Sequence, residues 1–574
     1  MIHDTAFPPG LADPCDMLGT IMTTSCPLAA GLLAAGVLAG ASATAAPDAP
    51  IPIRDAETVV FYGDSITEQN RYTSMIEAFL ISRLPAKRLV FHNCGWSGDT
   101  ARGGNARWDR DAAGVKPTLV FVNFGMNDGA YSEFGDWILD AYLPPQRDLA
   151  ARVKRQGTRE VILTPSCIDF HEGQCCYAQY NDTLDRVANA ALGLGGELGL
   201  ETVDIFHPML EVLGRFKAKR PKDTFTPDSI HPNAMGSFVM AWAVLRRLDF
   251  PRVVADLAVS ARTGATEFTL ALPFLPWFVP KNARPVLEFV PFEDELNRFR
   301  LTIPDWPADR PCHLAANGRP VAKTAASELA KGIDLALLDD APWARRGRAL
   351  SELAGYRNRI HMEAWRSSGL EAPAPARDLP GFAAARAARE ALIAQLADRM
   401  RDLARPGSWI VRLSARPLLG TATDQLRLIE GWEDPDAGPG FPWDESVAVG
   451  TTTQNHTEGT TAGTLDFDLA GYPWPALSGG FAYPQDFGRA TTFAVDVLAP
   501  AGSKLNVSLE LSTGGKKEKV SATGPVRAGR WDTVTFRLKD PDHVLAAAEG
   551  WSLAFTGTPT GRTTVLLDNL RLVR

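Results

Sequence analysis

Short apolar runs alternate with helical stretches between residues 58 and 250, and this alternation limits the chain to few folds. Each run is rich in Val, Ile, Leu and Phe, which is typical of strands buried on both faces. Strands are expected at 58–62, 88–93, 119–124, 160–164 and 201–205. The stretch "RYTSMIEAFLISRL" places Met75, Ile76, Phe79 and Leu80 on one helical stripe. Repeated βα units predict an α/β fold in which helices cover a parallel sheet.

The rest of the 574 residues has a different character. At about 100–200 residues per domain, a chain of this length predicts about three domains. Residues 251–330 are apolar and broken by prolines, with a hairpin signal at Asn317-Gly318. Helices are expected at 343–368 and 381–404, and Gly- and Thr-rich strands recur from about 410, as in a β-sandwich. The predicted parts are a leader (1–46), an α/β domain (47–250), a β-module with a helical segment (251–408) and a β-sandwich (409–574).

The N-terminal region resembles an export signal. An apolar core over about 28–41 precedes Ala43-Thr44-Ala45, an A-x-A cleavage pattern, and the core is too short to span a bilayer. No Lys or Arg precedes the core, which departs from the pattern, and a buried apolar helix is the alternative. On the export interpretation the mature chain begins near Ala46 and works in the periplasm or outside the cell, with no stable membrane span.

Charge and cysteine content restrict the partners and the compartment. The net charge of −8 and the lack of a long basic run argue against nucleic acid or an anionic membrane as partner. The mature chain would keep an odd number of cysteines, whose spacing does not fit a zinc site: Cys94, Cys167, Cys175, Cys176 and Cys312. A bridge from Cys167 to either Cys175 or Cys176 is compatible with an oxidising compartment, and the sequence leaves this pairing open.

Polar residues follow the carboxyl ends of the predicted strands, where the ligand crevice of an open α/β sheet lies. The four stretches are "GDS" at 63–65, "NCGWSGDTARGG" at 93–104, "GMNDGAY" at 125–131 and "TPDSIHPNAMG" at 226–236. They supply a serine, a glycine-rich backbone, an asparagine amide and an Asp-x-x-His turn. These groups are therefore expected to converge at one edge of the sheet.

The chemistry of these groups is complementary. A serine hydroxyl becomes a good nucleophile when a base takes its proton, and His231 can be that base for Ser65. Asp228, three residues earlier, can orient the imidazole ring and stabilise its charged form. An oxyanion formed by the attack could be bound by the backbone N–H groups of Ser65 and Gly98 and by the Asn127 amide.

Each assignment has a rival in the sequence. "DIFHP" contains a second Asp-x-x-His, Asp204 to His207, but Asp204 lies near the end of a buried strand. Gly95 is the alternative to Gly98. Turn or cap residues are the alternative interpretation of the serine and asparagine, and the two further aspartates of these stretches are expected to be caps and network residues: Asp64 and Asp128.

The four stretches, taken together and in this order, resemble the blocks of the SGNH (GDSL-type) hydrolase family. Ser65, Gly98, Asn127 and His231 match the residues that give the family its name. The resemblance covers about 58–250 and implies a flavodoxin-like three-layer fold and an ester or acyl hydrolase. Ile66 stands where the family usually has leucine.

Several aromatic side chains are expected in loops near the crevice: Tyr72, Trp96, Tyr131 and His171. Their rings are candidates for binding sugar rings, and packing is the alternative. No metal-ligand cluster occurs near Ser65, so the predicted hydrolysis uses no metal or other cofactor.

The C-terminal region resembles jelly-roll carbohydrate-binding modules in "LIEGWED", "AGRWDTVTFRL" and "LLDNLRLV". The resemblance implies a structural calcium ion at Glu430 and Asp568, whose carboxylates suit this hard cation. The candidates for sugar stacking or for core packing are Trp432, Trp443 and Trp474. A spacer is the alternative role. The stretch from "KGIDLALL" to "HMEAW" resembles an extension found in some large bacterial SGNH proteins, which would act as a scaffold or a crevice wall.

These features together predict an exported serine esterase that removes acyl groups, above all O-acetyl groups, from a polysaccharide or another acylated glycan. The acetyl assignment rests on analogy with the family and on the appended module. The rivals are a lipid ester or thioester hydrolase and a non-catalytic glycan-binding protein. The intact Ser-Gly-Asn-Asp-His set argues against the last of these.

Overall fold

The computed structural model describes residues 50–173, 177–379 and 381–415 and ten segments of the C-terminal region. Those segments are 426–430, 441–442, 448–452, 462–467, 476–480, 492–513, 516–521, 525–537, 548–557 and 563–573. All of them belong to one unit, Pro50–Arg574, and the predicted leader lies outside the described residues. Of the helices in the described part, none is both long and apolar enough to cross a membrane.

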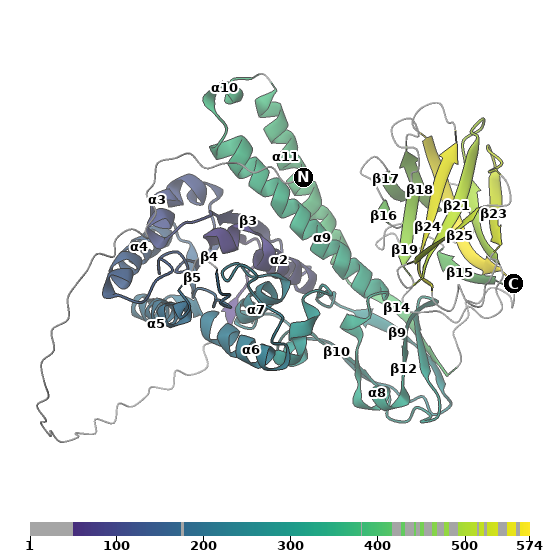
Figure 1. Cartoon of the computed structure of the whole chain (residues 1–574), viewed down its shortest axis with the longest axis horizontal. Coiled ribbons are helices and arrows are strands. Elements are labelled where there is room, and N and C mark those ends of the chain that lie inside the picture. The colour runs from purple at the N-terminus through teal and green to yellow at the C-terminus, as the bar shows by residue number, and fades with distance from the viewer. Residues whose placement is uncertain are drawn as a thin grey trace, which may run out of the picture. The chain divides into compact units, whose positions relative to one another are not determined.

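A five-stranded parallel sheet forms the centre of the α/β domain (Figure 1). Its strands, in spatial order, are β3 (Val90–Gly95), β2 (Thr58–Gly63), β4 (Leu119–Asn123), β5 (Arg159–Leu163) and β6 (Glu201–Val203). Numbered along the chain, this is the order 2-1-3-4-5 of flavodoxin-like sheets. The predicted parallel sheet is confirmed, and the predicted strand ends differ from the observed ones by a few residues.

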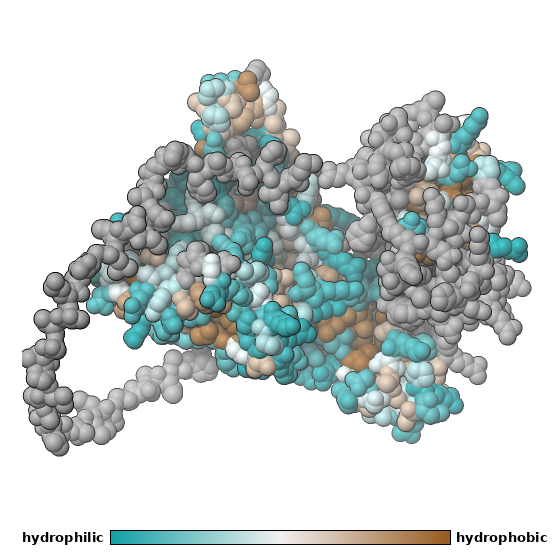
Figure 2. All heavy atoms as spheres, viewed as in Figure 1, coloured by the Kyte–Doolittle hydropathy of each residue, from teal (hydrophilic) through white to brown (hydrophobic). Residues whose placement is uncertain are grey.

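Alternate residues of β2 enter two different cores, because successive side chains of a strand point to opposite faces. Val59 and Phe61 lie in one cluster, and Val60 and Tyr62 lie in the other. The first face is covered by α2 (Arg71–Arg83), α6 (Phe206–Lys219) and α7 (Ala234–Leu245). The second is covered by α3 (Ala101–Asp111), α4 (Asp136–Arg155) and α5 (Tyr180–Leu198). Hydrophilic residues predominate on the outside of these helices in Figure 2.

Smaller elements complete the α/β domain. The short β1 (Ile51–Pro52) pairs in parallel with β7 (Leu248–Asp249), so the first and last described parts of the domain meet. The turn of 3-10 helix η2 (Ala113–Val115) follows α3. The nucleophile candidate lies on α1 (Ser65–Glu68), directly after β2.

Two small sheets follow the α/β domain and share one hydrophobic core. One contains β8 (Val253–Ala258), β10 (Arg298–Thr302) and β13 (Ile333–Asp334), and the other contains β9 (Ala265–Leu272), β14 (Gly407–Ser414), β11 (Cys312–Ala316) and β12 (Arg319–Thr324). The connecting helices are η3 (Arg284–Phe289), η4 (Glu293–Asn297), α8 (Ala326–Lys331) and η5 (Leu335–Leu337). Asn317 and Gly318 both have left-handed φ values, 48° and 78°, and join β11 to β12 in a two-residue turn. The predicted hairpin is confirmed.

The predicted domain boundary between 408 and 409 needs correction, because it cuts through β14. That strand pairs with β9 and with β11, so it belongs to the middle β-module and not to the C-terminal region. Strand pairing with residues more than 90 positions away gives no local signal in the sequence.

A pair of long helices is inserted between β13 and β14. They are α9 (Pro342–Met362) and α11 (Phe382–Leu403), which run alongside each other (Figure 1). A π-helical turn, η6 (Glu363–Leu370), and α10 (Ala374–Arg377) connect them. Helix α9 also packs against α2 and β3 of the α/β domain. Arg357 of α9 forms a buried, two-pronged ion pair with Glu77 of α2, at 2.7 and 2.6 Å.

The described C-terminal segments form two antiparallel sheets, as the predicted strand pattern requires. One holds β17 (Ala448–Thr452), β18 (Ala462–Phe467), β25 (Thr563–Val573), β20 (Thr492–Leu498) and β23 (Trp531–Arg537), with β15 (Leu426–Glu430) paired to β25. The other holds β16 (Phe441–Pro442), β19 (Ala476–Gly480), β24 (Ala548–Gly557), β21 (Leu505–Thr513) and β22 (Lys516–Ser521). Residues from both sheets share one hydrophobic core. The jelly-roll topology and the sugar-binding role stay predictions, and Trp432, Trp443 and Trp474 lie outside the described residues.

Candidate active site

Ser65 begins α1 at the carboxyl end of β2. Asp64 caps this helix, since its carboxylate accepts a hydrogen bond from the Ile66 N–H at 2.9 Å. Gly63 permits the sharp turn, because a Cβ there would lie 2.4 Å from Thr67 Oγ1 and 2.5 Å from the Asn123 carbonyl. The Gly-Asp-Ser sequence thus turns the chain from strand to helix and leaves Ser65 half-buried at the sheet edge.

His231 lies directly beside this serine. Its Nε2 atom is 2.9 Å from Ser65 Oγ, and its Nδ1 atom is 2.6 Å from Asp228 Oδ2. The structure therefore brings Ser65, His231 and Asp228 into one continuous chain of hydrogen bonds, in the arrangement that activates a serine hydroxyl. The imidazole and the hydroxyl come from positions 166 residues apart.

A tight turn holds the Asp228 carboxylate in place. Its Oδ1 atom accepts hydrogen bonds from the Ile230 and His231 N–H groups, at 3.0 and 2.7 Å. Ser229 at the centre of the turn is buried and has φ +67°, a conformation that is uncommon for a residue with a side chain. Partial burial acts to raise the pKa of Asp228, but the hydrogen bonds from His231 and Ile230 outweigh it and lower this pKa below its ordinary value.

The predicted oxyanion groups lie on the neighbouring loops. The N–H of Ser65 is at the first position of α1, where no helical acceptor exists. The Asn127 amide donates one hydrogen bond to the Asp99 carbonyl at 2.8 Å, and its oxygen accepts a bond from the Tyr131 hydroxyl. These two bonds fix the orientation of the amide and leave one of its N–H donors for another acceptor.

The two glycines considered as oxyanion donors in the 93–104 stretch, Gly95 and Gly98, have different surroundings. A Cβ on Gly95 would lie 2.2 Å from the Glu68 backbone nitrogen, so Gly95 allows β3 to approach α1. Gly98 has φ +72° and no atom within 4 Å of where its Cβ would stand. Gly98 therefore serves an open left-handed loop, whereas Gly95 serves packing.

Two buried aspartates lie in the loops around Ser65. Asp128 accepts hydrogen bonds from the N–H groups of Ala101 and Gly125, each at 3.0 Å, and so joins the start of α3 to the Asn127 turn. Burial raises the pKa of Asp64 to about 7 and that of Asp128 to about 6. Their contacts are those of the predicted cap and network residues.

Arg107 is a structurally central residue that the sequence analysis missed. Its guanidinium donates to the carbonyls of Gly63 and Cys94 at 2.9 and 2.8 Å and forms an ion pair with Asp99 at 2.6 Å. The Asp99 carbonyl in turn accepts the Asn127 amide. Arg107 thus braces both the serine turn and the Asn127 loop. The only signal in the sequence is one arginine on a helix after "SGD", which is too common to single out.

The rival histidine has other partners. His207 Nδ1 lies 2.8 Å from Asp204 Oδ2, and His207 Nε2 lies 2.9 Å from Asp185 Oδ1. Both ring nitrogens therefore face carboxylates on the described part of the α/β domain, and the base candidate beside Ser65 is His231.

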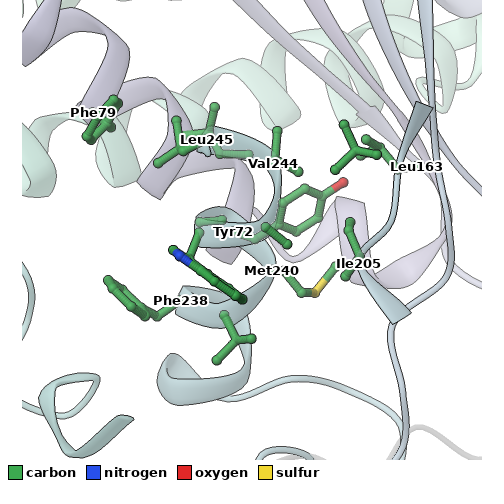
Figure 3. Close-up of a cluster of buried hydrophobic side chains, with 14 of the residues drawn as sticks. Tyr72, Phe79, Leu163, Ile205, Phe238, Met240, Val244 and Leu245 are labelled. Carbon is green, nitrogen blue, oxygen red and sulfur yellow. The ribbon is translucent and has the colours of Figure 1, made fainter. Parts of the chain in front are cut away.

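The predicted aromatic residues do not all line the crevice. Tyr72 is a correction: only 1% of it is exposed, and its hydroxyl bonds to Thr67. Figure 3 shows its ring among apolar side chains that include Leu163, Ile205 and Met240. The residue lies in the first turn of α2, four positions before Ile76 and on the same apolar stripe, so helical spacing was the signal that could have placed it in the core.

The other three predicted aromatic residues, Trp96, Tyr131 and His171, are partly exposed and contact the loops of the site. Trp96 lies under the guanidinium groups of Arg110 and Arg366, whose carbon centres are 4.9 and 4.1 Å from the ring centroid. Tyr131 holds the Asn127 amide, as described above. His171 donates its backbone N–H to Ser229 Oγ at 2.8 Å, so it lies against the Asp228 turn.

Metal and disulfide predictions concern regions that are described only in part. No group of three or more His, Cys, Asp or Glu side chains is placed to hold a metal ion in the described residues. Asp568 is fully buried in β25, and Glu430 is paired opposite Leu570 of the same strand, so the calcium site stays a prediction. Cys167 is a buried free thiol, and Cys175 and Cys176 lie outside the described residues.

Comparison with known proteins agrees with this geometry. Residues 61–237 match the model of the GDSL-like lipase/acylhydrolase family. The chain contains a GDSL/SGNH hydrolase domain. An acetylxylan esterase from Geobacillus stearothermophilus is 26% identical over 219 residues, which are 34% of this chain and 96% of that protein. The family and this relative make the hydrolase domain an esterase or acylhydrolase by class.

Two further matches extend the comparison. The GDSL esterase/lipase CPRD49 from Arabidopsis thaliana is 31% identical over 150 residues, 24% of this chain and 56% of that protein. The solved structure of BT4096, a gut microbial diltiazem-metabolizing enzyme, is 23% identical with a TM-score of 0.55, and covers 63% of this chain and 98% of its own. The likeness in fold to BT4096 therefore continues beyond the hydrolase domain.

Proposed function

We propose that this protein is a serine esterase that removes acyl groups, above all O-acetyl groups, from a polysaccharide. The observation that carries the proposal is the chain of contacts from Ser65 through His231 to Asp228, at 2.9 and 2.6 Å. This geometry is that of a nucleophile, a general base and an orienting carboxylate.

In the first half of the reaction, Ser65 Oγ attacks the ester carbonyl carbon while His231 Nε2 takes its proton. Asp228 holds the Nδ1–H bond and stabilises the imidazolium that forms. His231 then gives the proton to the sugar oxygen, the C–O bond breaks, and the alcohol leaves an acyl group on Ser65. In the second half, His231 takes a proton from water, whose oxygen attacks the acyl carbon. His231 returns that proton to Ser65 as the carboxylic acid departs.

Both halves pass through a tetrahedral oxyanion. The proposed donors are the Ser65 N–H at the start of α1, the Gly98 N–H on its left-handed loop and the remaining N–H of the Asn127 amide. Backbone donors at the start of a helix are fixed before the reaction begins, so they bind the developing charge without reorganising.

The substrate class rests on the acetylxylan esterase relative, whose name states its substrate, and on the C-terminal region. In this proposal the two antiparallel sheets form a jelly-roll carbohydrate-binding module with a structural calcium ion at Glu430 and Asp568. The first 46 residues direct export, and the enzyme works in the periplasm or outside the cell without a catalytic cofactor.

Two measurements test the proposal. A fluorophosphonate probe is expected to label the wild type and not Ser65→Ala, and a protein that neither labels nor hydrolyses esters would be a binding protein. Acetate release is then measured on acetylated xylan, mannan, pectin and peptidoglycan. Release that depends on Ser65 supports the polysaccharide assignment. If only small p-nitrophenyl esters are cleaved, the mechanism stands and the polysaccharide assignment falls in favour of a lipid ester or thioester.

A further inference from the structure

The helical extension contributes a cation to the edge of the candidate active site. Arg366 lies on η6, outside the matched family segment, and it forms ion pairs with Glu68 of α1 and, at 2.5 Å, with Glu371. Its guanidinium also lies over the Trp96 ring, 4.1 Å from the centroid. One residue of the extension thus contacts two segments of the hydrolase domain that carry predicted reacting groups.

Both contacted residues lie within three positions of a predicted reacting group. Glu68 follows Ser65 by three positions on α1, and residues at this spacing lie about 5–6 Å apart at Cβ on one helix face. Trp96 precedes Gly98 by two positions. The backbone N–H of Trp96 donates a hydrogen bond to the Gly63 carbonyl at 2.9 Å. Arg366 therefore contacts both α1 and the loop that carries Gly98, the two segments next to the candidate nucleophile.

The surrounding contacts hold the arginine in place. The neighbouring Trp365 packs edge-on against Trp96, with ring centroids 6.2 Å apart, and stacks on His361 of α9. Helix α9 is itself anchored to the hydrolase domain by the buried Arg357–Glu77 ion pair. A side chain anchored in this way is preorganised for binding, because little of its freedom remains to be lost.

The Arg366 guanidinium has N–H groups that its ion pairs leave for hydrogen bonds to a ligand. A guanidinium has five N–H donors, and the two ion pairs use two of them within the described residues. The side chain is 21% exposed, so part of it is accessible from solvent. Glu68 and Glu371 together exceed its single positive charge, and the neighbouring Arg110 is itself paired with Asp111, which disfavours an anionic ligand. Hydroxyl and ring oxygens of a neutral sugar are the acceptors that suit such a site.

We propose that Arg366 is a substrate-binding residue that the extension supplies to the hydrolase domain, and that it donates hydrogen bonds to the neutral saccharide part of the ester. The inference rests on the proposed function. It assigns to the extension a part in substrate selection, in place of a scaffold alone.

The test compares two substrates, an O-acetylated xylo-oligosaccharide and p-nitrophenyl acetate, which has no saccharide. The ratio of their kcat/KM values is measured for the wild type and for Arg366→Met and Arg366→Lys. We expect Arg366→Met to lower the saccharide-to-nitrophenyl ratio about tenfold, chiefly through KM, as for the loss of about one hydrogen bond from a charged donor. Arg366→Lys should lower it less, since it keeps a cation but not the planar fork.

Arg359→Met is the matched control. Arg359 is on α9, stacks on Tyr356 at 5.5 Å and should leave the ratio unchanged. Thermal unfolding of each variant checks that the fold is kept. An equal loss on both substrates would overturn the inference, because Arg366 would then only brace α1. An Arg366→Met variant with the wild-type saccharide-to-nitrophenyl ratio would also overturn the inference. A wild type that releases acetate from nitrophenyl ester but from no saccharide would instead remove the proposed function, and the inference with it.

Discussion

Two Asp-x-x-His-Pro segments of the hydrolase domain, 204–208 and 228–232, share the same contacts between aspartate and histidine, although the first leads into α6 and the second is a turn. In each, the aspartate accepts the histidine N–H and bonds to its Nδ1 atom, at 2.8 Å for His207 and 2.6 Å for His231. They differ at Nε2, which meets the Asp185 carboxylate in the first and the Ser65 hydroxyl in the second.

The two segments show that the motif orients a histidine and that a residue distant in the chain supplies the group facing its Nε2 atom. Partial burial acts to lower the pKa of His207, but Asp185 and Asp204 together raise it above its ordinary value. A histidine held between two carboxylates favours its protonated form, and a protonated imidazole cannot act as a base. The hydroxyl beside His231 imposes no such charge.

The largest expected effect separates the two histidines. His231→Gln should lower kcat by about 10⁴- to 10⁶-fold, since a serine without its base is a weak nucleophile. His207→Gln, with the same substitution at the same motif position, should stay within about twofold of the wild type, because it has no contact with Ser65. Hydrolysis of p-nitrophenyl acetate measures both. A comparable loss in both variants would refute the assignment of the base.

Substitutions of the two motif aspartates, Asp228 and Asp204, should differ almost as much in their effect on kcat. Asp228→Asn should lower kcat about 10⁴-fold, since an amide favours the wrong tautomer of the ring. Asp204→Asn removes the equivalent contact of His207 and should leave the rate close to that of the wild type. Steady-state kinetics at saturating ester tests this pair, and full activity of Asp228→Asn would contradict the proposed role.

A pair of asparagines extends the comparison to the oxyanion. Asn127→Ala should lower kcat by about 10²- to 10³-fold, as expected when one donor to an oxyanion is removed. Asn189, whose amide bonds to Asp185 beside His207, provides the matched substitution. Asn189→Ala should not affect kcat. An unchanged rate in Asn127→Ala would show that its amide does not face the oxyanion.

The smallest effect is on stability and depends on pH. Because the pKa of His207 is higher in the folded than in the unfolded chain, its contribution is fully present below the unfolded pKa of about 6.5 and is lost as pH rises through the folded value. The Tm difference between wild type and His207→Gln should therefore be larger at pH 5.5 than at pH 9. Calorimetric scans at both pH values measure it, and an equal difference at both would show that the ion pairs do not contribute.

Features that depend on local sequence could be predicted. The buried strands follow from continuous apolar runs, and Ser65, Asn127 and His231 follow from polar blocks that a parallel sheet gathers at one edge. The turn at Asn317-Gly318 was predictable because few other residues accept two successive left-handed conformations.

Features that depend on long-range packing could not be predicted from the sequence. Arg107, Arg366 and the strand β14 act through partners far away in the chain, and their own residue types are unremarkable on a helix or strand. Tyr72 was misplaced for a different reason, because it lies at helical spacing from Ile76 and Phe79 and was nevertheless assigned to a loop. Helix α2 is covered on one side by the sheet and α7 and on another by α9, so its first turn is buried together with the rest of its apolar stripe.

The pairing of β9 with β14 has a consequence for the whole extension. These neighbouring strands close a loop that contains residues 273–406, and with them both long helices. Arg366 is therefore held near α1 at a high effective concentration, as a tethered ligand would be. A local opening that detaches α9 need not carry it away, because the strands still limit how far it can travel. The extension is thus tethered to the middle β-module at both of its ends.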